Sequence, residues 1–209
     1  MSTATLSRKA RTSRVVAASA LTVALGGGLL ACGQGGDKPG PDVKVDNSAT
    51  SQAKNVAEPL KASKPTGLKI PSAGVDSKSM LDLTTDASGE LGVPPVDKAD
   101  QPGWWKDGPT PGEKGASVLV AHYDTAKGPA LMKNIKNVKV GDEIDVPRAD
   151  GSTAKFKIRE VQQVNKKDFP TNKVYGETNR AELRLLTCGG GLEGGHRTDN
   201  IILYADLVK

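Results

Sequence analysis

Cys188 is the residue of this sequence best suited to chemistry. A thiol becomes an effective nucleophile when a nearby base or cation stabilises its thiolate, so histidines and arginines that could converge on Cys188 are its candidate partners. The sequence has two histidines, His122 at the end of an expected strand and His196 in a glycine-rich stretch after the cysteine. Arg197 is the one arginine that follows Cys188. These residue types are those of nucleophilic catalysis by a thiol.

The neighbours of Cys188 favour an accessible thiol. The cysteine ends the apolar run 183–187 and is followed by three glycines at 189–191. This order predicts a sulfur at the end of a strand, beside backbone that a substrate can approach closely. A buried, inert cysteine is the alternative, and the polar, glycine-rich surroundings argue against it. As the partner base we expect His122, with His196 as a loop residue.

Two other chemistries can be weighed against thiol catalysis. Four residues could supply metal ligands: Cys188, His122, His196 and Asp199. No Cys-x-x-Cys or His-x-x-x-His spacing holds two such ligands on one element, so we expect no metal and no other cofactor. A papain-type Cys/His peptidase uses a comparable pair, but its cysteine opens a helix. An exported binding protein without activity is the non-enzymatic alternative, and the combination of Cys188, His122 and Arg197 argues against it.

Short strands dominate residues 66–209. Segments rich in β-branched and aliphatic residues and bounded by Gly, Pro, Asn or Asp predict strands at 67–70, 79–83, 117–121, 143–146, 154–164, 182–187 and 200–207. Asp150-Gly151 predicts a hairpin turn, and Pro129 after Gly128 predicts a short helix over 129–135. In the last strand, hydrophobic residues occupy both alternating faces, which predicts a strand in the middle of a sheet. Many short strands with little helix favour an all-β, closed or nearly closed barrel.

The N-terminal residues 1–32 have the features of an export signal. Basic residues precede an uncharged stretch over 15–31 that ends in small residues. The sequence Leu-Leu-Ala before Cys32 resembles the lipobox of bacterial lipoproteins, so we expect lipid attachment at Cys32, with an uncleaved membrane anchor as the alternative. Residues 33–65 are rich in Gly, Pro, Ser, Lys and Asp and predict a flexible tether, which leaves 66–209 as the catalytic domain. Either attachment would hold the protein on the extracellular face of the cell membrane.

Charge and cysteine content narrow the possible partners. The formal net charge is +5, but residues 1–65 carry nine Lys/Arg and four Asp/Glu, whereas residues 66–209 carry twenty of each. The expected domain is therefore neutral, and we expect no nucleic-acid partner. The chain has two cysteines. If Cys32 is acylated, Cys188 is alone in an oxidising compartment and cannot form a disulfide within the chain.

Several short motifs occur in the order found in sortases. They are Gly103-Trp104-Trp105, Ala121-His122-Tyr123-Asp124, Gly128-Pro129-Ala130, Gly141-Asp142, Thr187-Cys188, Arg197, and Asp199-Asn200 with the apolar strand that follows. Together they resemble the class F sortases of actinobacteria, and the resemblance spans roughly residues 71–208. In that family an arginine often directly precedes the Asp-Asn pair, whereas here Thr198 intervenes. Alternation along the strand would then turn Arg197 to another face.

The resemblance implies a closed eight-stranded β-barrel with one or two short helices and an active site at the ends of neighbouring strands. It implies a cysteine transpeptidase in which Cys188 attacks the sorting signal of a secreted protein, and an amine such as that of a cell-wall precursor, or another nucleophile, resolves the thioester. His122 would act as acid and base, and Arg197 would stabilise the oxyanion. Thr187 and Asp124 would orient substrate or neighbouring side chains. Residues 165–178 are expected to line the groove for the sorting signal.

Overall fold

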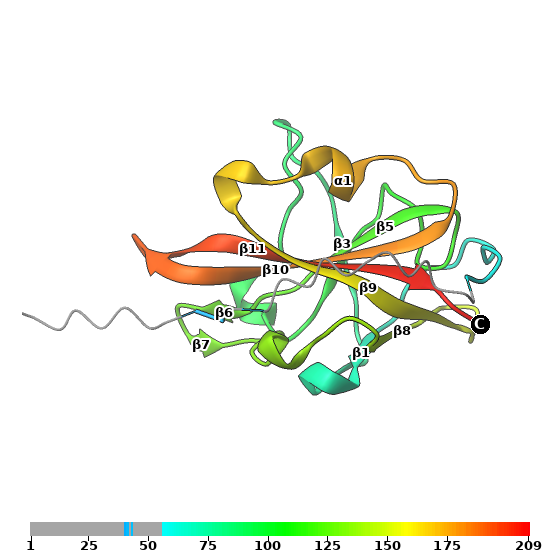
Figure 1. Ribbon diagram of the computed structural model, residues 1–209, viewed down its shortest axis with the longest axis horizontal. Helices are drawn as coiled ribbons and strands as arrows, with labels where there is room; N and C mark the ends of the chain where they lie inside the picture. The colour runs from blue at the N-terminus through cyan, green and yellow to red at the C-terminus, as the bar shows by residue number, and fades with distance from the viewer. Residues whose placement is uncertain (1–39, 42, 44–55) are drawn as a thin grey trace, which may run out of the picture. The chain divides into compact units, whose positions relative to one another are not determined.

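The computed structural model describes residues 40, 41, 43 and 56–209 (Figure 1). The expected leader over 1–32, with Cys32, and most of the expected tether lie outside the described residues. Within the described part of the chain, no helix is both long and apolar enough to cross a membrane. The attachment to the membrane therefore stays a prediction.

Nearly all of the regular structure is β-strand. The strands are β1 (Leu68–Ile70), β2 (Val75–Ser77), β3 (Leu81–Leu83), β4 (Gly103–Trp105), β5 (Gly115–Val120), β6 (Asp124–Thr125), β7 (Gly128–Pro129), β8 (Glu143–Pro147), β9 (Thr153–Asn165), β10 (Ala181–Glu193) and β11 (His196–Leu207). The α-helix α1 spans Thr171–Tyr175, and short 3-10 helices cover Pro71–Ala73, Val96–Lys98, Ile135–Asn137 and Lys166–Asp168. The expected all-β class is confirmed.

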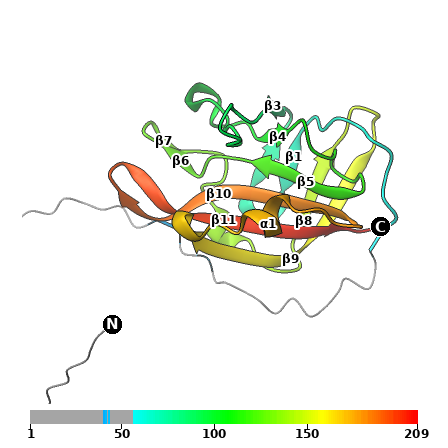
Figure 2. The same ribbon diagram turned by 90° about the horizontal axis from the view of Figure 1, so that it is seen from above.

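One sheet of nine strands forms the body of the domain, in the order β2-β1-β8-β9-β11-β10-β5-β4-β3, and β6 pairs separately with β7. The sheet curls into a half-barrel, as Figure 2 shows from above. The strand count exceeds the expected eight because the short strands β2 and β4 also join the sheet. The two edge strands, β2 and β3, are not paired with each other in this part of the chain.

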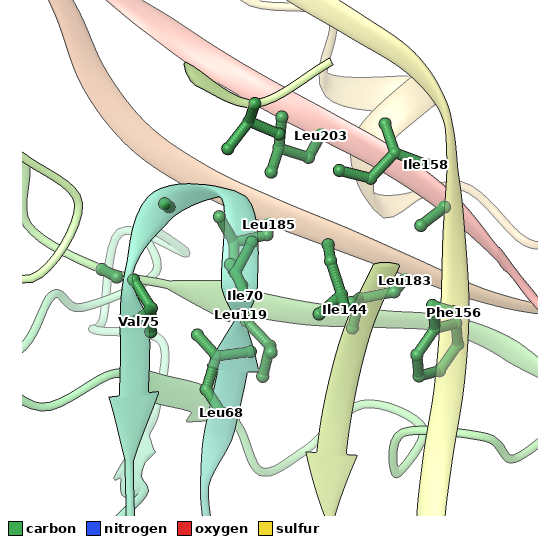
Figure 3. Packing of buried hydrophobic residues seen from close by; sticks show 14 of the residues in the cluster. Leu68, Ile70, Val75, Leu119, Ile144, Phe156, Ile158, Leu183, Leu185 and Leu203 are labelled. Atoms are coloured by element: carbon green, nitrogen blue, oxygen red, sulfur yellow. The ribbon is translucent and has the colours of Figure 1, made fainter. Parts of the chain in front are cut away.

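The core lies inside the curl of the sheet. Alternate residues of β10 and β11, among them Leu183, Leu185 and Leu203, have no exposed surface and meet Leu68 and Phe156 from the other wall (Figure 3). The opposite face of the same strands is also covered, because Leu186, Ile202 and Tyr204 form a second buried cluster with Val174 of α1. The expected mid-sheet position of the last strand is confirmed, since β11 lies between β9 and β10.

The helix expected over 129–135 is not formed. Gly128 and Pro129 instead make strand β7, and the next backbone N–H groups donate across the chain, from Ala130 to the carbonyl of Tyr123 and from Met132 to that of His122. These hydrogen bonds replace the i to i−4 bonds of a helix, and only the 3-10 helix Ile135–Asn137 follows. The segment thereby becomes a support for the backbone at His122. The hairpin turn at Asp150-Gly151 is as expected, with Gly151 at φ 83°.

Ordered backbone contacts begin before the expected domain start at residue 66. Ala57 N–H donates to the carbonyl of Leu207, and Leu60 N–H donates to that of Gly112. Val56 also pairs with Val208 in an isolated bridge. Residues 56–65 therefore contact the domain, with Ala57 beside the end of the last strand and Leu60 beside Gly112.

Candidate active site

Cys188 lies within β10 and not at the strand end that the sequence predicts, because the strand continues through a bulge to Glu193. It is on the face of the sheet that α1 covers. It shares this face with Leu186 because side chains alternate along a strand, and the ladder between β10 and β11 is regular through Gly189. A bulge then follows between Gly189 and Leu192. Gly190 has φ 73°, and a Cβ there would lie 2.5 Å from Thr198 Oγ1, so only glycine fits. The glycines after the cysteine therefore shape the end of the strand.

His122 is brought to the same edge by β5, which runs parallel to β10. Val120 pairs with Leu186 in this ladder, so two further residues along each strand place His122 and Cys188 on one face. The Nε2 atom of His122 lies 2.6 Å from the carbonyl oxygen of Pro94. A carbonyl can only accept, so Nε2 carries a proton, and Nδ1 is the ring nitrogen that can accept a proton from a thiol in the neutral tautomer.

The two residues line one groove of about 590 Å³. Its walls are Gly89, Glu90, Leu91, Val93, Val120, Ala121, Lys166, Phe169, Thr171, Tyr175, Leu186, Thr187 and Asn200. Four of these residues, from Lys166 to Tyr175, belong to the segment 165–178 that was expected to line the groove. The other wall, 89–93, comes from the loop between β3 and β4.

The charge state of Cys188 results from opposing effects. Partial burial raises the pKa of the thiol above its ordinary value, Lys166 and Arg197 lower it, and Asp124 raises it. The net pKa is raised, so the free enzyme holds a neutral thiol at pH 7. Such a thiol needs a base within the groove, and His122 is the histidine that lines it.

Arg197 and Asp124 form a buried ion pair beside the groove. Arg197 donates from Nη2 and Nε to Asp124 Oδ2 at 2.6 and 3.1 Å, and from Nη1 to the carbonyl of Gly190 at 3.2 Å. The guanidinium carbon also lies 5.2 Å from the centre of the Tyr123 ring. Arg197 is not one of the described residues that line the groove. Its charge nevertheless acts on Cys188, because it lowers the pKa of the thiol.

The remaining candidates, Thr187 and His196, differ in their position, because Thr187 lies in the groove lining beside Cys188 and His196 lies outside it. Thr187 is 3% exposed and its Oγ1 has no hydrogen-bond partner within the described residues, because its side chain points to the core face. His196 is exposed and pairs with Glu193 at the tip of the β10–β11 hairpin, outside the groove lining. No cluster of three or more His, Cys, Asp or Glu side chains that could hold a metal occurs in the described ranges.

Three groups were assigned no role in the site from the sequence. The carbonyl of Pro94 is backbone and comes from a distant loop. Lys166 acts on the thiol only through space, and Asn200 lies directly opposite Cys188 in the ladder. Counting residues back from the hairpin would have paired other residues, because the glycine bulge shifts the register.

The half-barrel places a cysteine of β10 and a histidine that follows β5 in one groove, an arrangement suited to thiol chemistry. The family model of the sortase domain matches residues 68–208. This chain belongs to the sortase family, whose members are cysteine transpeptidases.

Solved structures support the same fold. A sortase D5 transpeptidase from Clostridium perfringens is 19% identical, with 70% of this chain and 79% of that chain covered and a TM-score of 0.51. A lid mutant of sortase A from Corynebacterium diphtheriae is 19% identical, with 71% and 73% covered and a TM-score of 0.52. The lid mutant of Streptococcus agalactiae sortase C1 is 16% identical, with 72% and 70% covered and a TM-score of 0.52. No curated protein matches the chain significantly.

Proposed function

We propose that this sortase cleaves the C-terminal sorting signal of secreted proteins through a thioester on Cys188 and transfers the protein to an amine of the cell envelope. The observation that carries the proposal is the single groove that both Cys188, within β10, and His122, two residues after β5, line. We further propose that the enzyme is of class F and acts at the extracellular face of the membrane, because the motif order and the leader favour both.

In the first half-reaction the sulfur of Cys188 attacks the carbonyl carbon of the scissile peptide bond. In the neutral form of His122 the thiol proton passes to Nδ1, the nitrogen left to accept it when Nε2 donates to the carbonyl of Pro94. The C–N bond then breaks, and the imidazolium returns the proton to the departing amine. The products are the free C-terminal piece and a thioester between Cys188 and the secreted protein. The Pro94 carbonyl also stabilises the imidazolium, because it faces a positively charged donor in that state.

In the second half-reaction an amine attacks the thioester carbon. His122 takes a proton from the attacking nitrogen, the C–S bond breaks, and the proton passes to the departing sulfur. A new amide bond forms and the neutral Cys188 thiol is restored. Water in place of the amine would give hydrolysis through the same steps.

Arg197 supplies positive charge next to the reacting carbonyl in this proposal. Its guanidinium is fixed by Asp124 and by the Gly190 carbonyl, so the charge is oriented before substrate arrives. Asp124 then acts by positioning Arg197. The hydroxyl of Thr187 faces away from the groove, which leaves its backbone to contact substrate.

The test is to trap the acyl-enzyme. The full chain would be incubated with a randomised peptide library and the covalent adduct on Cys188 would be identified by mass spectrometry. We expect an adduct equal to the N-terminal part of the peptide, which an added amine such as triglycine then releases as a longer peptide. Cys188→Ala is the control and should give neither product. Absence of any adduct with the wild-type chain would overturn the proposal and would favour a binding role, and release only by water would favour a peptidase.

A further inference from the structure

Asn200 is the residue that faces Cys188 most directly. The two residues are partners in the antiparallel ladder between β10 and β11. Directly opposed side chains in such a ladder share a face, with Cβ atoms about 4.5–5.5 Å apart. Ile202 and Tyr204, at the next alternate positions of β11, are buried in the cluster on the groove side. The Asn200 side chain therefore points into the groove, and the residue is part of its lining.

The amide of Asn200 is available to a ligand. Its neighbour Asp199 accepts hydrogen bonds from Gln163 Nε2 at 2.8 Å and from Asn165 Nδ2 at 3.4 Å. Asn200 takes no part in this network, and within the described residues no hydrogen bond involves its side chain. It is half-buried beside the thiol. An amide in this position has two N–H donors with which to bind an oxygen in the groove.

Arg197 lies on the same strand but is oriented differently. It is three residues from Asn200, so alternation places the two side chains on opposite faces, and the bulge turns its end of the strand further. Its donors contact Asp124 and the Gly190 carbonyl. The guanidinium can act on the thiol by charge, whereas a direct donor at the reacting carbonyl has to come from a residue that lines the groove.

We infer that Asn200 is a catalytic residue whose side-chain N–H donates a hydrogen bond to the carbonyl oxygen of the substrate. This oxygen becomes an oxyanion when the carbonyl carbon bonds to the sulfur of Cys188. This inference rests on the proposed function. The amide donor is neutral, so it leaves the charge state of the free thiol unchanged. Its hydrogen bond to the substrate oxygen becomes stronger as negative charge develops on that oxygen.

Turnover of the library peptide that acylates the wild-type chain fastest tests this role. Asn200→Ala should lower kcat by about 100-fold, the usual effect of removing one oxyanion donor, with KM changed by less than about threefold. Asn137→Ala removes an exposed asparagine outside the groove and should keep wild-type turnover. Thermal unfolding of each variant checks that the fold persists.

A second readout needs no substrate. Asn200→Asp places a carboxylate where the amide was, and its negative charge disfavours the thiolate. Alkylation of Cys188 by iodoacetamide at pH 7 should therefore slow by at least about threefold, whereas Asn200→Ala should leave the alkylation rate nearly unchanged. A residue with only a structural role would not separate the two variants in this way.

The outcomes separate this inference from the function on which it rests. Turnover of Asn200→Ala within threefold of wild type would overturn the oxyanion role while the transpeptidase function stands. Equal alkylation of Asn200→Asp and wild type would overturn the placement of the side chain beside the sulfur. A wild-type chain that never forms the acyl-enzyme would overturn the proposed function, and the inference with it.

Discussion

A single carboxylate oxygen of Asp124 accepts two hydrogen bonds from Arg197, at 2.6 Å from Nη2 and 3.1 Å from Nε. The contact joins β6, two residues after His122, to the start of β11. Arg197 is 7% exposed and Asp124 is 25% exposed in their side chains, so the pair is shielded from solvent. Arg197 is thus held by a residue of a segment far away in the sequence.

The ion pair predicts opposite effects on thiol reactivity when its members are replaced. Asp124 raises the pKa of Cys188 and Arg197 lowers it, so Asp124→Asn should increase the thiolate fraction at pH 7 and Arg197→Gln should decrease it. We expect iodoacetamide to alkylate Asp124→Asn faster than wild type and Arg197→Gln slower, each by about two- to fivefold. Changes of the same sign would mean that the ion pair acts on Cys188 through structure rather than charge.

The two histidines should differ sharply in their importance. His122→Gln removes the base of the groove, and acylation by the library peptide should fall by about 10²–10⁴-fold. His196→Gln changes an exposed residue at the hairpin tip and should keep turnover within twofold of wild type. Single-turnover acylation followed by mass spectrometry measures both. The reverse order of the two effects would show that the acid and base is His196.

Lys166 should act on the thiol through screened charge. It lowers the pKa of Cys188 from an exposed position, so Lys166→Gln should slow alkylation at pH 7. The difference from wild type should shrink at 0.5–1 M salt, because the Debye length falls to about 3 Å at 1 M. The effect of Arg197→Gln should persist at high salt because that side chain is buried. Equal salt sensitivity of the two variants would contradict this assignment.

The strands were predictable because their signals are local. Runs of β-branched residues within β9 and β11 and the turn at Asp150-Gly151 depend on neighbours in the sequence. The helix was predicted over 129–135, whereas the α-helix forms over Thr171–Tyr175, because tertiary contacts determine the structure of both segments. The backbone at 130–132 is used by His122 and Tyr123, whereas α1 (Thr171–Tyr175) forms where Val174 can be buried under the sheet.

Cys188 and His122 could be chosen as candidates from residue types, but their surroundings could not. The two residues line one groove, and their roles as nucleophile and base stay predictions. The partner of Arg197 is seventy-three residues away in sequence, and the contact of His122 with Pro94 uses a backbone atom. The position of Asn200 opposite the thiol follows from a register that a bulge alters. These contacts depend on how the sheet curls, which no short motif encodes.

Glu182 should make the fold sensitive to acid. It is 3% exposed on β10, forms an ion pair with Arg184, and lies 3.1 Å from Arg159 and 2.7 Å from Arg180. Burial alone would raise its pKa, but the three arginines outweigh burial and lower it from 4.5 to about 2. The charged carboxylate therefore stabilises the fold at pH values above 4.5, and this contribution is lost as the pH falls from 4.5 toward 2.

Replacing this carboxylate should flatten the acid limb of the stability curve. Glu182→Gln leaves the buried Arg184 without its ion-pair partner, and we expect it to destabilise the fold at pH 7 by about 3–5 kcal/mol. Its melting temperature should then change less than that of wild type between pH 4.5 and 2. Glu143→Gln, at an exposed position of β8, is the matched control and should follow the wild-type curve.

Because Arg184 Nε also donates to the Lys173 carbonyl of α1 at 3.3 Å, loss of the Glu182 charge should loosen the helix that walls the groove. Parallel melting curves for Glu182→Gln and wild type across this pH range would rule out Glu182 as the source of the acid sensitivity.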